Sequence, residues 1–144
     1  MPTLKGHFKP KNPKKYIGRL KDIVYRSSWE KLWMNYCDTN ESVKKWSSEE
    51  IAIPYYNPIK KRRARYLPDF YMEYINKEGK LVKALVEIKP SKETKPPSYK
   101  RRTKNTLLAE AMYSQNQAKW KAAEEWCNKY RWEWKIITEK ELGL

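Results

Sequence analysis

Apolar side chains recur with the period of an amphipathic helix in two segments of the chain. In the first segment they fall at i, i+3, i+4, i+7 and i+8, as Trp29, Leu32, Trp33, Tyr36 and Cys37. Ser27 can cap this helix, Glu30 can complete a capping box, and residues 38–40 end it. The second segment runs from about residue 106 to 130, with a stripe of Leu107, Leu108, Ala111, Met112, Ala118, Ala122, Ala123, Trp126 and Cys127.

Strand-like segments lie between these helices and after the second one. Residues 66–75 and 81–89 flank a turn, and if residues 77–79 form a three-residue loop with a left-handed Gly79, Asp69 lies opposite Glu87. Residues 132–137 predict a last strand. Residues 50–56 are also strand-like, but Pro54 cannot donate a ladder hydrogen bond, so that strand lies at an edge or ends there. One face of the hairpin is apolar, and we expect the long helix to cover it: Phe70, Met72, Tyr74, Val82, Ala84, Val86 and Ile88.

The length and charge of the chain indicate one basic domain. The 144 residues include 32 Lys and Arg against 17 Asp and Glu, a formal net charge of +15, which favours a polyanionic partner. We interpret residues 1–24 as a basic N-terminal arm, with His7 in a mobile tail, and residues 25–144 as the folded domain. Because no apolar run is long enough for a membrane span or a signal peptide, we expect a cytoplasmic protein with no membrane partner.

The few cysteine and histidine residues restrict the possible chemistry. Cys37, Cys127 and His7 are the complete set, which argues against zinc fingers and against Ser-His or Cys-His catalytic pairs. Any reaction must therefore use carboxylates, lysine and a metal that prefers oxygen ligands.

Such a group of residues is present in the predicted hairpin. Asp69 and Glu87, on strands about 4.8 Å apart, could both bind one Mg²⁺ ion. Lys89 projects from the same face as Glu87, because it lies two residues further along the strand. Hydrolysis of a phosphodiester needs this combination of a metal and a cation that orients the nucleophile and offsets developing charge.

These residues carry a resemblance to a known family. Tyr66-Leu67-Pro68-Asp69-Phe70 followed by Val86-Glu87-Ile88-Lys89 resembles the signature of the PD-(D/E)XK nuclease superfamily. A wider pattern from about residue 25 to 139 resembles the head-completion nucleases of tailed bacteriophages and the TnsA-like transposon endonucleases. It includes Ile53-Pro54-Tyr55-Tyr56-Asn57-Pro58 and the arginine-rich segment before the Pro-Asp motif.

The resemblance implies a restriction-endonuclease-like α/β fold, with a small mixed sheet, a central hairpin and flanking helices. It further implies a Mg²⁺-dependent deoxyribonuclease, with Mn²⁺ as a substitute and no nucleotide cofactor, that cuts or trims double-stranded DNA. Phage head, portal or neck proteins are the implied partners, in the bacterial host or the virion. The implied metal ligands are Glu30, Asp69, Glu87 and Ile88; Lys89 and Gln117 join the acidic residues as catalytic candidates, while Lys119 on the same helix stays open.

Two basic runs are candidates for contact with DNA phosphates. Their residues are Lys60, Lys61, Arg62, Arg63, Arg65, Lys100, Arg101, Arg102 and Lys104. Arg65 and Tyr66 also adjoin the predicted site. Two other functions stay open: a TnsA-like transposon or repair endonuclease that needs a partner subunit, and a non-catalytic DNA-binding or capsid-neck protein.

Overall fold

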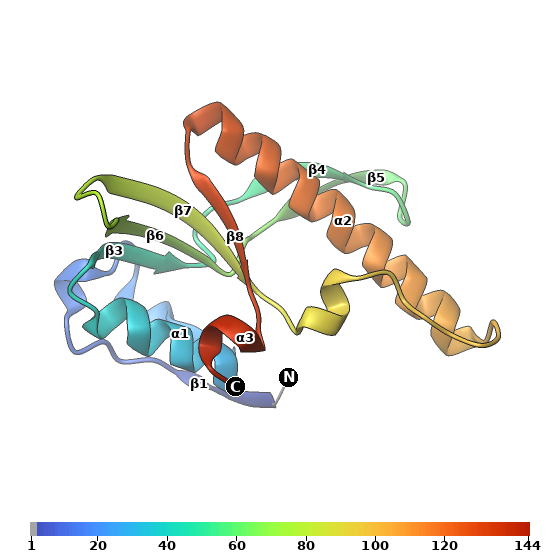
Figure 1. The fold of residues 1–144 in the computed structure, drawn as a ribbon, viewed down its shortest axis with the longest axis horizontal. Coiled ribbons are helices and arrows are strands. Elements are labelled where there is room, and N and C mark those ends of the chain that lie inside the picture. The colour runs from blue at the N-terminus through green and yellow to red at the C-terminus, as the bar shows by residue number, and fades with distance from the viewer. Residues whose placement is uncertain (1–2) are drawn as a thin grey trace.

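A four-stranded mixed sheet forms the centre of the computed structural model, which describes residues 3–144 (Figure 1). Its order is β3-β6-β7-β8, with the bounds Val43–Ser48, Phe70–Ile75, Leu81–Ile88 and Glu133–Ile137. The first three strands are antiparallel, and β8 is parallel to β7. The arrangement of a mixed sheet with flanking helices confirms the predicted restriction-endonuclease-like fold.

The predicted hairpin register is confirmed. Phe70 pairs with Val86, Tyr71 with Leu85 and Ile75 with Leu81, and Gly79 has a φ of 78°, in the left-handed region. A short loop of fixed length sets the pairing of the two strands, and through it the face on which each side chain lies.

Two helices cover opposite faces of this sheet. The short helix α1 spans Ser28–Thr39 and the long helix α2 spans Lys104–Tyr130, the latter connecting the parallel strands β7 and β8. Met34 and Cys37 of α1 pack with Phe70, Met72, Ala84, Val86 and Ile88. The expectation that the long helix covers this apolar face is therefore wrong, because α1 lies there. Helix α2 packs on the other face, against Tyr71 and Leu85, through Trp120, Ala123 and Cys127.

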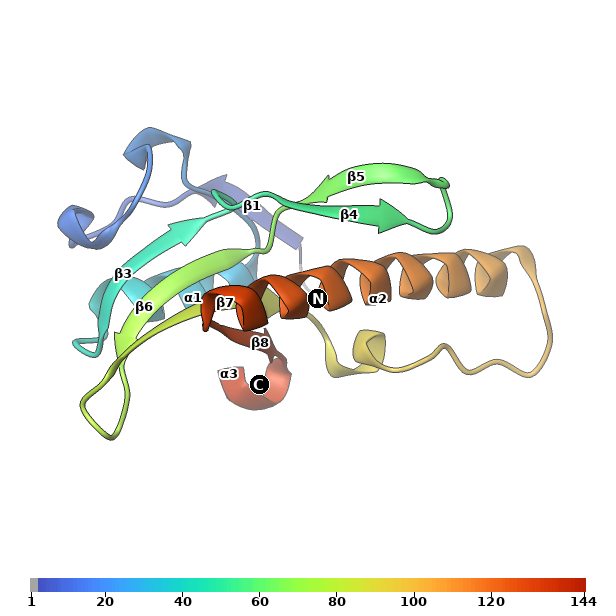
Figure 2. The same ribbon diagram turned by 90° about the horizontal axis from the view of Figure 1, so that it is seen from above.

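Helix α2 covers the sheet with only part of its length. Its three buried residues are all in the C-terminal half, whereas Leu107, Leu108 and Met112 are exposed. The predicted stripe is thus wrong for the N-terminal half, which extends beyond the sheet (Figures 1 and 2). In α1, Leu32 and Tyr36 of the predicted stripe are likewise exposed, since the buried face is centred on Met34 and Cys37.

The basic N-terminal segment is folded against the domain. Its strand β1, Thr3–His7, pairs with β2, Val24–Ser27, and the 3-10 turns η1 and η2 span Pro13–Lys15 and Leu20–Asp22. Phe8, Tyr16 and Ile23 are buried in the same cluster as Trp46. Residues 3–24 are therefore not a separate mobile arm, because their apolar side chains complete the core; residues 1–2 of the predicted arm lie outside the described residues.

The segment predicted as a basic loop forms half of a second hairpin. Strand β4 spans Ile53–Asn57 and pairs antiparallel with β5, Arg62–Tyr66, so only residues 58–61 form the turn. Figure 2 shows this hairpin running alongside α2. Pro54 lies in a two-stranded sheet, which agrees with its predicted edge position.

Two short elements complete the chain. They are the turn η3, Ser91–Thr94, and the helix α3, Glu139–Leu142. In the described part of the chain, no helix has the length and apolar character needed to cross a membrane.

Candidate active site

Asp69 lies at the point where one strand ends and the next begins. Strand β5 ends at Tyr66 and β6 starts at Phe70, so the predicted continuous strand over residues 66–75 is interrupted by Leu67, Pro68 and Asp69. In this short connection the backbone N–H of Asp69 faces Glu87 and donates to Oε1 at 3.3 Å. Its Oδ2 accepts from the backbone N–H of Ile88 at 2.8 Å. These bonds hold the two acidic residues side by side, as the hairpin register predicts.

Glu87 is buried on the α2 side of β7, and its two oxygens face different partners. Oε1 accepts a hydrogen bond of 2.6 Å from the Tyr66 hydroxyl. Oε2 lies 3.9 Å from the Nζ atom of Lys89. Glu87 and Lys89 share a face because strand side chains alternate, and Ile88 between them points into the α1-side core. Glu87 and Lys89 therefore lie on the α2 side of the sheet, and Ile88 lies on the α1 side.

The two carboxyl groups are electrostatically unfavourable in the absence of a further cation. Burial raises the pKa of Asp69 well above its ordinary value, and the neighbouring charge of Glu87 raises it further. Burial also raises the pKa of Glu87, against the opposing effects of the Tyr66 hydrogen bond and the Lys89 charge. Lysine therefore does not fully compensate this pair of negative charges.

Glu30 reaches the same region from the first turn of α1. Ser27 caps this helix by accepting from the Glu30 N–H at 3.1 Å, as predicted. The Glu30 carboxylate accepts from the backbone N–H of Arg26 at 2.9 Å, one residue before the expected capping-box donor. Burial raises the pKa of Glu30, and its charge in turn contributes to the raised pKa of Asp69. Glu30 is therefore near the pair and also has a role in capping α1.

A hollow of about 400 Å³ opens beside Glu87. It is lined by Arg26, Glu49, Arg65, Tyr66, Leu67, Glu87 and Lys119. Lys119 of α2 lies with its Nζ atom 5.8 Å from the centre of the Tyr66 ring. Gln117 is exposed and lines a different hollow with Trp120 and Trp134, so the structure brings Lys119 to Glu87 and leaves Gln117 apart.

The ligands near Asp69 and Glu87 suit a hard divalent cation. Both groups offer carboxylate oxygens, and no hydrogen bond of the described residues reaches Asp69 Oδ1. The raised pKa values indicate a need for positive charge at this point. Ile88 could contribute only its backbone carbonyl, because its N–H is bonded to Asp69 and its side chain is buried. Within residues 3–144, no three acidic, histidine or cysteine side chains lie close enough to form a complete metal site, so Glu30 is not brought into a triad with this pair.

The sequence pattern gave no reason to select two residues at the hollow. Arg26 and Glu49 form an ion pair of 2.6 Å, and the Glu49 N–H donates to the Asp69 carbonyl at 3.1 Å. Glu49 has a φ of 53°, an unusual conformation for a residue other than glycine. Because this pair joins segments distant in sequence, only the three-dimensional structure reveals it.

The basic residues predicted to contact DNA are all exposed and fall in two places. Lys60 and Lys61 lie in the β4–β5 turn, while Arg62, Arg63 and Arg65 belong to β5. The other residues, Lys100, Arg101, Arg102 and Lys104, lie in the loop before α2 and at its first residue. Both places extend from the same side of the molecule (Figures 1 and 2).

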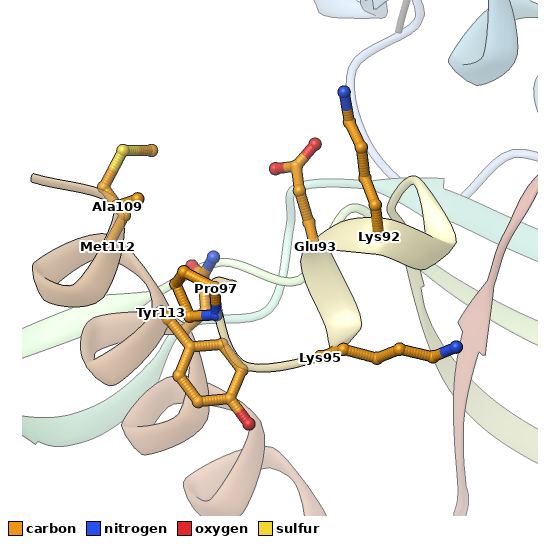
Figure 3. Close-up of a pocket in the computed structure, with 8 residues that line it drawn as sticks. Lys92, Glu93, Lys95, Pro97, Ala109, Met112 and Tyr113 are labelled. Atoms are coloured by element: carbon orange, nitrogen blue, oxygen red, sulfur yellow. The ribbon is translucent and has the colours of Figure 1, made fainter. Parts of the chain in front are cut away.

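A separate hollow of about 240 Å³ lies between η3 with its following loop and the N-terminal half of α2 (Figure 3). Its lining includes Lys92, Pro97, Met112 and Tyr113. Neither Asp69 nor Glu87 lines it, so it is not part of the candidate site.

Comparisons with known proteins agree on the class of chemistry. The family model described as TnsA-like endonuclease N terminal matches residues 40–139, which include Asp69, Glu87 and Lys89. The head completion nuclease of Enterobacteria phage T4 is 36% identical over 145 residues, covering 95% of this chain and 92% of that protein.

Proposed function

The chain belongs to the TnsA-like endonuclease family, as its motifs predict, and we propose that it is a DNA nuclease of bacteriophage head completion whose catalysis depends on Mg²⁺. The observation that carries this proposal is the pairing of Asp69 and Glu87 beside Lys89, within the segment that the family model matches. We assign the acidic pair to metal binding, with Mn²⁺ as a substitute. Phage head, portal or neck proteins, in the bacterial host or in the virion, are the proposed partners.

Each residue of the site has a different role in the proposed hydrolysis of a phosphodiester. A divalent ion bound to the two carboxylates would supply Lewis acidity toward the scissile phosphate. Lys89 orients the attacking water and offsets the charge that develops on phosphorus, since its ammonium group adjoins Glu87. Tyr66 holds Glu87 in one orientation through its hydroxyl. Lys119, which also lines the hollow, is placed to attract a DNA phosphate.

Incubation of the purified protein with linear and circular double-stranded DNA, in Mg²⁺ or in EDTA, tests the function. We expect cleavage in Mg²⁺ only, and a loss of about 10³-fold in Asp69→Asn and Lys89→Ala with DNA binding retained. Lys83→Ala is the matched control, because Lys83 lies exposed on the same strand, away from the hollow. Cleavage that persists in EDTA or in both site variants would contradict the assignment.

The family match also supports a transposon-type endonuclease as a second candidate. Such an enzyme would need a partner subunit for targeting, so the purified chain alone would bind DNA without cutting it. Cleavage by the isolated chain therefore favours the head-completion function. A wild-type protein that binds DNA but stays inactive with and without phage or transposon partners is a non-catalytic binding protein.

A further inference from the structure

The two faces of the β4–β5 hairpin differ in exposure. Along β4, Ile53, Tyr55 and Asn57 are buried, while Pro54 and Tyr56 are exposed. The buried face packs on α2 in the cluster that contains Trp120. The basic run in β5 is therefore divided between an inner face toward α2 and an outer face.

The register assigns each arginine to a face. Arg63 pairs with the outward Tyr56, and Arg65 pairs with the outward Pro54. Arg62 pairs with the buried Asn57 and so starts from the inner face. The outer face thus presents Tyr56, whose exposed fraction is 58%, together with two of the three arginines.

The outer face continues into the candidate active site. Arg65 lines the hollow beside Glu87, and Arg63 lies two residues further along the strand, about 6.6 Å away. Both arginine side chains therefore start from neighbouring outward positions of the same strand. Among residues 3–144, no carboxylate forms an ion pair with either arginine, so both guanidinium groups are available to phosphates.

The helix behind the hairpin restricts how DNA can be held. A two-stranded ribbon alone fits the major groove, which is about 12 Å wide. With α2 packed along its inner face, the hairpin is thicker than a single ribbon, since a helix adds about 10 Å. Its outer face is therefore the face of the hairpin that is open to the sugar-phosphate backbone of DNA.

We propose that the outer face of the β4–β5 hairpin binds the backbone of duplex DNA next to the active site, through Arg63, Arg65 and Tyr56, and that Arg62 takes no part. This inference rests on the proposed nuclease function. The arginines contact phosphates, and the Tyr56 hydroxyl, opposite Arg63 on the neighbouring strand, donates to a phosphate oxygen. Binding through these residues is independent of base sequence and directs a strand toward Glu87.

The salt dependence of DNA affinity separates these roles. With a duplex of about two helical turns in EDTA, we expect Arg63→Ala and Arg65→Ala each to reduce the slope of log K against log salt by about 0.9. Arg62→Ala, the matched control from the same strand, leaves the slope unchanged. Tyr56→Ala weakens binding about 5-fold without altering the slope, because tyrosine carries no charge. Two duplexes of unrelated sequence should respond equally.

Failure of this inference can be told apart from failure of the nuclease function. If the wild type cleaves DNA in Mg²⁺ but the slope changes equally for Arg62, Arg63 and Arg65, the proposed difference between the two hairpin faces is wrong and the nuclease function stands. Unchanged slopes in Arg63→Ala and Arg65→Ala also contradict the proposed DNA-binding face. The expected slopes without wild-type cleavage support the hairpin surface and contradict DNA cleavage by the isolated chain. Thermal unfolding of each variant confirms that these exposed substitutions leave the fold unchanged.

Discussion

The two faces of the central sheet are built from different side chains. Under α1 the buried cluster is almost entirely apolar, with Met34, Trp46, Phe70 and Met72 among its members. The cluster under α2 is smaller and includes Tyr55, Tyr66 and Tyr71, whose hydroxyl groups need polar partners. Glu87 belongs to this second side, since its oxygen bonds Tyr66.

This difference separates stability from chemistry. An apolar interior stabilises the fold but offers no ligand or proton donor. The side with tyrosines keeps two carboxylates of raised pKa next to each other, an arrangement that lowers the stability of the folded protein and suits a cation site. We expect substitutions on the α1 side to change stability, and substitutions on the α2 side near Glu87 to change catalysis.

The largest expected effect tests the α1 side. Met72 is 3% exposed and packs in the α1-side cluster, so Met72→Ala should lower the free energy of unfolding by about 3 kcal/mol. Urea denaturation measures this change, and cleavage per folded molecule should stay at the wild-type level. Met112→Ala is the same substitution at a residue that is 53% exposed, and should cost less than about 0.5 kcal/mol. A clear fall in cleavage per folded molecule in Met72→Ala would contradict the separation of stability from chemistry.

The parts of this organisation that follow local rules could be predicted from the sequence. Turn length and strand alternation set the pairing of the central hairpin, and hence the meeting of Asp69 and Glu87. The face covered by each helix could not be predicted, because β7 has apolar residues on both faces, with Val86 toward α1 and Leu85 toward α2. Either helix could therefore cover either face of β7 with the same sequence pattern.

Residues that act through long-range contacts could not be predicted either, because such contacts leave no local pattern in the sequence. The ion pair between Arg26 and Glu49 has no periodic signal and joins different elements. The choice between Gln117 and Lys119 depended on the rotation of α2 about its axis, which the apolar stripe fixed poorly because its N-terminal half is not buried. The Arg62 to Arg65 run resembles a loop by composition, yet its pairing with β4 makes it a strand.

A smaller effect tests the α2 side. Tyr66→Phe removes the hydroxyl that positions Glu87 and keeps the buried ring. We expect the cleavage rate to fall about 10-fold or more, and the free energy of unfolding to change by about 1 kcal/mol. Steady-state cleavage assays and urea denaturation measure the two quantities. Tyr71→Phe is the control on the same face, because its hydroxyl bonds Glu73 outside the site. If both variants lose the same activity, the Tyr66 hydroxyl has no specific role in positioning Glu87.

The smallest effect compares the two faces through the thiols of the two helices, Cys37 of α1 and Cys127 of α2. Burial raises the pKa of both thiols, to about 11 for Cys127, so alkylation in the native state requires opening of the structure. The buried residues of α2 all lie in its C-terminal half, so α2 should open at a lower free energy than α1. In dilute urea, alkylation followed by mass spectrometry should therefore modify Cys127 at least about 10-fold faster than Cys37, with equal rates in the unfolded chain. Faster modification of Cys37 would show that the α1 side is the weaker one, and the apolar cluster would then no longer be the main source of stability.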